Sequence, residues 1–117
     1  MADETEKRKD GLSDEHGLIV DRLATEYEDV AHLVTPAGDL FVFRRPEQDA
    51  YEDYLDGRDK KKRLGPLYRD LTDRSLVHGD LKAWREYCKR KPAVAGEAAN
   101  VLLILATSES DVTAKKG

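Results

Sequence analysis

The strongest structural signal in this chain lies in residues 33–46, which read LVTPAGDLFVFRRP. The run Leu40 to Phe43 is rich in residues typical of β-strands, and it follows a turn sequence that contains Pro36 and Gly38. Alternation from Val30 supplies a second strand before the turn, so the two strands pair most simply as an antiparallel β-hairpin. The chain must therefore fold around a hairpin.

Helices must cover this hairpin, because two strands alone are marginally stable in water. Apolar residues recur at helical spacing in five segments, about residues 14–27, 46–56, 64–77, 80–91 and 92–106. Ser13 and Asp80 are predicted N-caps, and Gly57 is predicted to end the second helix. The predicted fold class is α+β, mainly α, with one antiparallel β-hairpin at about residues 30–45 packed with four to five short helices.

The length of 117 residues predicts a single domain. Residues 1–12 mix both charge signs and can bury little, so they are predicted to form a disordered charged tail. Residues 107–117 are predicted to form a disordered polar tail for the same reason. The globular domain is therefore expected at residues 13–106.

The composition narrows the classes of function. The formal net charge of -4 disfavours a general attraction to nucleic acids or anionic membranes. The single cysteine, Cys88, cannot form an intramolecular disulfide and fits a reducing compartment. No apolar run approaches the roughly 20 residues that span a bilayer, and no signal peptide is recognised. We therefore expect a cytoplasmic protein with no membrane contact.

The residues that could carry chemistry are scattered. The histidines are predicted in a helix, a strand and a turn, without metal-binding spacing: His16, His32 and His78. Cys88 follows Trp84 and Tyr87 on an amphipathic helix, as a small core residue would. Glycine-rich phosphate loops, nucleophile elbows and dinucleotide fingerprints are absent from the sequence. We expect no enzymatic activity, no cofactor and no metal.

The basic run Lys60 to Arg63 is the one hint of nucleic-acid binding. Asp56 and Asp59 lie beside it, and no aromatic residue is interleaved to stack on a base. A solvated loop or a partner-facing patch is the favoured interpretation. A small nucleic-acid-binding regulator is kept as an alternative function.

The order of the elements resembles that of the small tail assembly chaperones of long-tailed bacteriophages. The resemblance covers about residues 23–106 and rests on two segments, RLATEYEDVAHLVTPAGDLFVFRRPEQDAYEDYL and KRKPAVAGEAANVLLILA. The first is similar to the family's short helix, its hairpin ending in an aromatic residue, a basic residue and a proline, and the helix that opens there. The second is similar to the family's last helix, which begins at a proline and turns apolar.

This resemblance implies a non-enzymatic protein of the bacterial host cytoplasm. Such a protein binds the phage tape-measure protein stoichiometrically during tail assembly, prevents its aggregation and is absent from the finished virion. A longer frameshifted product often recruits tail-tube subunits in this family. The alternative function is a structural virion or tail-completion component that remains in the particle.

The partner-binding surface is predicted from apolar residues that extend beyond the one face of a helix or strand needed for core packing. These candidates are Phe41, Phe43, Leu103 and Ile104. A partner could lay a helix in an apolar groove or add a strand to the hairpin. The exposed edges of a hairpin also make a homo-oligomer possible.

Overall fold

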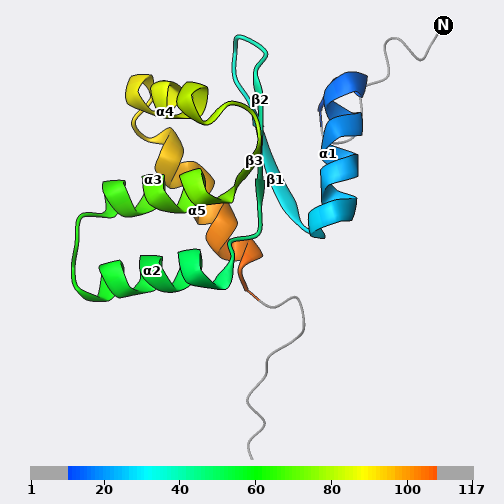
Figure 1. Ribbon diagram of the computed structural model, residues 1–117. Helices are drawn as coiled ribbons and strands as arrows, with labels where there is room; N and C mark the ends of the chain where they lie inside the picture. Colours follow the sequence, from blue (N-terminus) through cyan, green and yellow to red (C-terminus); the bar gives the residue numbers. More distant parts are fainter. Residues whose placement is uncertain (1–10, 108–117) are drawn as a thin grey trace, which may run out of the picture.

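The computed structural model describes residues 11–107 and consists of a three-stranded antiparallel sheet with helices on both faces (Figure 1). The fold is α+β and mainly α, as predicted from the sequence. In chain order the elements are α1 (Asp14–Tyr27), β1 (Val30–Val34), β2 (Leu40–Arg44), α2 (Gln48–Asp59), α3 (Leu64–Ser75), β3 (Leu76–His78), α4 (Leu81–Arg90) and α5 (Val94–Leu105). The predicted tails lie almost entirely outside the described residues.

The predicted hairpin is formed by β1 and β2, with Val34 opposite Leu40. Its turn is closed by a hydrogen bond of 2.8 Å from the Gly38 N–H to the Thr35 carbonyl oxygen. Gly38 has a φ of +95°, which L-residues with a side chain rarely adopt. The Asp39 N–H donates to Thr35 Oγ1 over 3.1 Å. Proline, glycine and the threonine hydroxyl thus define the turn.

A third strand, β3, pairs antiparallel with β2 and makes β2 the central strand. The sequence prediction of a helix through about residue 77 was wrong at its end, because Leu76 leaves the helix and lies opposite Phe43. Gly79 follows at a φ of +104°, where a Cβ atom would lie 2.5 Å from Phe41 Cδ1. Pairing with β2, which helical periodicity does not reveal, fixes this segment.

Strand β2 is buried on both faces. Phe41 and Phe43 belong to the cluster formed with α2, α3, α4 and α5, whereas Leu40 and Val42 belong to a cluster formed with α1. Because both faces are covered, β2 has a continuous apolar run instead of alternation with polar residues. The molecule therefore has three layers: α1, the sheet, and the other four helices (Figure 1).

Trp84 of α4 lies at the centre of the main cluster and is fully buried. Its ring centroid is 5.3 Å from that of Phe41 and 4.9 Å from that of Phe43, at tilted and edge-on angles that favour aromatic contact. The indole Nε1–H donates to Thr72 Oγ1 over 3.2 Å, so its polar group is satisfied inside the core. These contacts tie α3 and α4 to the sheet.

Helix α1 covers the second face of the sheet through Val20 and Leu23. The N-cap prediction is confirmed, because the His16 N–H donates to Ser13 Oγ over 3.1 Å. Leu12, one residue before the predicted domain boundary, is buried in the same cluster. The second predicted N-cap, Asp80, is also confirmed by a 2.8 Å bond from the Ala83 N–H.

The prediction that Gly57 ends α2 was wrong. Gly57 is a buried residue inside the helix, which continues to Asp59. A Cβ atom at this position would overlap the side chain of Leu67, so the glycine lets α2 and α3 approach closely. The chain instead reverses at Lys61, which has a φ of +58°. Close helix packing, and not termination, explains this glycine.

Candidate partner-binding site

The outer edge of β1 is the first feature of the candidate site. Two hydrogen bonds at its ends fix how the strand pairs with β2: the Thr35 N–H donates to the Asp39 carbonyl over 2.9 Å, and the Arg45 N–H donates to the Asp29 carbonyl over 3.3 Å. In an antiparallel pair, residues that exchange hydrogen bonds alternate with residues whose backbone groups point outward. Odd-numbered residues of β1 therefore bond to β2.

It follows that Val30, His32 and Val34 direct their backbone N–H and C=O groups away from β2. Within residues 11–107, none of the backbone hydrogen bonds formed outside the helices and the sheet involves these three residues. Unpaired groups of this kind are a template for a further strand. The β1 edge is thus the backbone part of the site.

Both faces beside this edge are occupied by helices. Helix α1 packs against β1 from one side and α5 packs against it from the other (Figure 1). Ala31 and Leu33 are half-buried against the main cluster, whereas His32 is exposed and Val34 is 40% exposed. An added strand would therefore meet protein on each face and not only the edge.

Helix α5 contributes an exposed apolar side. Ala99 and Leu102 are fully buried in the main cluster, but Val101 is 45% exposed and Ile104 is 68% exposed. The last two are three residues apart, so they lie on one side of the helix. The wide apolar stripe expected from the sequence thus divides into a core side and an outer side.

The four predicted binding residues differ in their exposure. Ile104 lies on the outer side of α5, and Leu103 is half-buried against the main cluster. Phe41 and Phe43 are only 2% and 1% exposed, so they are core residues that no partner can reach in this fold. The correction has a simple cause: the face of β2 that carries them points at Trp84.

Sequence reasoning missed three parts of the site. The exposed Val101 was not among the predicted residues, because the apolar run Val101 to Ala106 does not by itself show which side of the helix faces the core. Val34 was not singled out. The outward backbone of β1 was also not located, because it depends on β3 occupying the other edge of β2.

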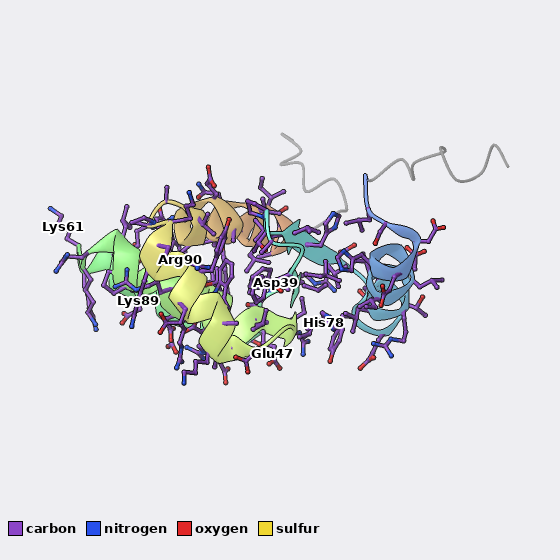
Figure 2. The ribbon with its side chains drawn as sticks, turned by 90° about the horizontal axis from the view of Figure 1, so that it is seen from above. Asp39, Glu47, Lys61, His78, Lys89 and Arg90 are labelled. Atoms are coloured by element: carbon purple, nitrogen blue, oxygen red, sulfur yellow. The ribbon has the colours of Figure 1, made fainter. Side chains whose placement is uncertain are left out.

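Two of the scattered histidines lie beside the same hollow in the folded chain. His16 of α1 and His78 of β3 line one hollow of about 380 Å³, together with Asp39 and Asp80. Figure 2 shows Asp39 and His78 near the sheet, between α1 and the helical layer. Among residues 11–107, no group of three or more histidine, cysteine, aspartate or glutamate side chains is placed to hold a metal ion.

Cys88 is a buried thiol, as expected for a core residue. Burial is the main cause that raises its pKa from 9.0 to about 11, Asp73 contributes in the same direction, and Arg69 opposes it. A thiol reacts as a nucleophile in its deprotonated form. At neutral pH Cys88 is therefore a protonated, unreactive side chain.

The basic run Lys60 to Arg63 lies in the connection between α2 and α3 and is exposed. Lys60 Nζ is 3.1 Å from Asp56 Oδ2. Lys61 projects at the end of the molecule farthest from α1 (Figure 2). This segment lies on the opposite side of the molecule from α1 and is not part of the candidate site at β1.

The part of the chain that the structure describes contains no helix with the length and apolarity needed to cross a membrane.

Comparison with known proteins supports the fold. The sequence matches no protein-family model and no curated protein. A solved structure described as an uncharacterised protein, rbstp2171, from Bacillus stearothermophilus is similar, with a TM-score of 0.60 and 18% sequence identity. The match covers 82% of this chain and 99% of that chain. At this identity the likeness concerns the fold alone.

Proposed function

We propose that this protein is a phage tail assembly chaperone that acts in the host cytoplasm by binding the tape-measure protein stoichiometrically. The observation that carries the proposal is the unpaired edge of β1, with exposed apolar residues of α5 on the neighbouring element. The sequence resemblance described above supplies the identity of the partner. Recruitment of tail-tube subunits belongs to the same proposal.

The proposed mode of binding is strand addition. An extended segment of the tape-measure protein lies beside β1 and bonds to the outward N–H and C=O groups of Val30, His32 and Val34. Alternate side chains of that segment then face α5 and α1 in turn. The backbone bonds supply general affinity, and contact with Val101 and Ile104 favours apolar side chains.

This mode explains how a chaperone would prevent aggregation. A long apolar chain awaiting assembly aggregates through exposed strands and apolar segments. Capture of one segment at an edge strand pairs one edge of its backbone and covers the apolar side chains that face α5. Because α1 and α5 pack against β1, the two faces of the captured segment lie next to helices and are less open to further chains.

The test is a proline at the centre of the edge. His32→Pro removes the outward N–H and places a ring where a partner strand would lie, while the bonds from β1 to β2 involve only odd-numbered positions. His32→Ala is the matched control, because it changes the side chain and keeps the N–H. Each variant is co-expressed with the tape-measure protein, and the amount of soluble complex is measured.

The expected result is loss of the soluble complex with His32→Pro and its retention with His32→Ala. Circular dichroism of both variants shows whether the fold is kept. A folded His32→Pro variant that still solubilises the tape-measure protein would refute strand addition at β1. Double substitution of Val101 and Ile104 by serine is expected to weaken the complex, since it removes exposed apolar surface.

The alternative of a virion component is decided by a separate measurement. Mass spectrometry of purified virions is expected to detect no stoichiometric amount of this protein. Abundant copies in the particle would instead favour a structural or tail-completion role, whatever the outcome of the co-expression experiment.

A further inference from the structure

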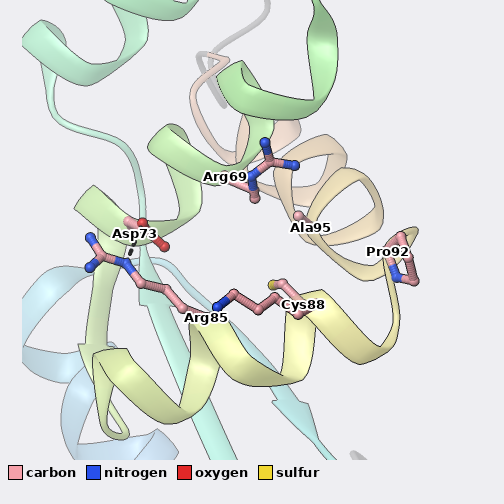
Figure 3. A pocket seen from close by; sticks show the side chains of 7 residues that line it. Arg69, Asp73, Arg85, Cys88, Pro92 and Ala95 are labelled. Atoms are coloured by element: carbon pink, nitrogen blue, oxygen red, sulfur yellow. Dashed lines mark hydrogen bonds and ion pairs between the residues drawn. The ribbon is translucent and has the colours of Figure 1, made fainter.

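A second concave region lies between α3, α4 and the start of α5 (Figure 3). Its volume is about 530 Å³, within the range of small-molecule sites. The lining residues are Arg69, Asp73, Arg85, Cys88, Lys89, Pro92 and Ala95. The helices α3 and α4 lie in the helical layer, whereas the candidate site is built on β1 in the sheet (Figure 1). This region, called the α3–α4 cavity below, is thus a separate feature.

The lining of the α3–α4 cavity is cationic, although the chain as a whole has a net charge of -4. Three positive side chains surround one carboxylate, Asp73, which accepts a 2.9 Å bond from Arg85 Nε. At the rim, Lys89 Nζ is 3.7 Å from a Glu86 oxygen in an exposed pair, which water screens. Arg69 makes no ion pair with any residue in the range 11–107. Positive charge is therefore left uncompensated at the mouth.

The floor of the cavity is apolar. Cys88 is 6% exposed and Ala95 is 4% exposed, and Pro92 closes one side at the start of α5 (Figure 3). These side chains offer no charge to a ligand. A cationic mouth above an apolar floor distinguishes this cavity from a basic surface that any polyanion could use.

We infer that the α3–α4 cavity binds a small organic phosphate monoester, with the phosphate at Arg69, Arg85 and Lys89 and the apolar body on Cys88, Pro92 and Ala95. The guanidinium groups match the geometry of phosphate oxygens, and a dianion balances the local excess of positive charge. The volume of about 530 Å³ admits a phosphate together with a body the size of an aromatic ring.

Three probes test this inference: phenyl phosphate, inorganic phosphate and benzyl alcohol. Each is titrated at low ionic strength into the full-length protein labelled with ¹⁵N, and amide shifts are followed. Phenyl phosphate is expected to shift residues 85–95 and Arg69 in a saturable manner. Inorganic phosphate should bind at the same residues more weakly, since it lacks an apolar body. Benzyl alcohol should leave the amide shifts of these residues unchanged.

Arg69→Gln and Lys62→Gln are the paired variants, because each removes one exposed positive charge and only Arg69 lines the cavity. Arg69→Gln is expected to weaken phenyl phosphate binding by about tenfold, the effect of losing one charge-assisted hydrogen bond, whereas Lys62→Gln changes it less than about twofold. Equal losses in the two variants would show general attraction by the surface and overturn the inference. Absence of saturable shifts with phenyl phosphate would overturn it as well, and so would benzyl alcohol binding as tightly as phenyl phosphate, because the phosphate group would then contribute nothing.

Discussion

Gly79 is the position where one added methyl group should harm this fold most. Its φ of +104° costs a side-chain-bearing residue about 1–3 kcal/mol. A Cβ atom would also lie 2.5 Å from Phe41 Cδ1 and 3.0 Å from the Leu40 carbonyl oxygen. Neither atom can move easily, because the Phe41 ring packs on Trp84 and Leu40 lies in the central strand. Such overpacking adds about 1–3 kcal/mol.

The expected total for Gly79→Ala is therefore a loss of roughly 4 kcal/mol in the free energy of unfolding. Urea denaturation followed by circular dichroism measures it, and the midpoint should fall by roughly 2 M for a domain of this size. Gly38→Ala is the matched control, because its φ is +95° but a Cβ atom would have no neighbour within 4 Å. That control should lose only the conformational part, about 1–3 kcal/mol.

The difference between the two variants isolates the close approach of β3 to β2. If Gly79→Ala and Gly38→Ala lose the same stability, the backbone conformation alone explains both glycines. A requirement for glycine at position 79 because of its closeness to Phe41 would then be refuted.

Two further predictions concern the core. Thr72→Val should lower the free energy of unfolding by about 1–3 kcal/mol, because it leaves the buried Trp84 Nε1–H without its acceptor. A double-mutant cycle with Trp84→Phe measures the coupling energy between the two residues, and a value of zero would contradict this prediction. Burial raises the pKa of Cys88 from 9.0 to about 11, so the folded protein holds this proton more tightly than the unfolded chain. The resulting stabilisation is complete below about pH 9 and is lost as the pH rises through 11. Wild-type protein should therefore lose about 2 kcal/mol more stability than Cys88→Ala between these pH values, and parallel unfolding curves would contradict this.

The fold class and the hairpin could be predicted because their causes are local. Thr35, Pro36 and Gly38 determine the turn by their own conformational preferences, and Ser13 and Asp80 cap helices within three residues. Such local signals do not depend on the tertiary arrangement. Segments whose structure is set by neighbours distant in sequence could not be predicted in this way.

β3 and Gly57 illustrate the second case. Leu76 continues a helical apolar stripe, yet it forms a strand because the free edge of β2 is nearby in space. Gly57 reads as a helix end, yet it remains inside α2 because Leu67 of the next helix needs the space. Both results depend on packing partners that periodicity does not identify.

The candidate site was predicted in part for a related reason. Sequence reasoning found the correct elements, the hairpin and the last helix, and it named the exposed Ile104. It also named Phe41 and Phe43, since strand alternation defines two faces without saying that both are covered. Only the placement of α1 against one face and Trp84 against the other decides that β2 has no exposed side.

The burial of β2 on both faces has a consequence for how the domain opens. Its four buried side chains divide between the cluster with the helical layer and the cluster with α1, so the central strand couples these two layers. The α1 cluster is the smaller of the two, and α1 packs chiefly on β1 and β2. Amide hydrogen exchange should consequently resolve two opening reactions: detachment of α1 at a low free energy, and loss of β2 protection only when the whole domain unfolds.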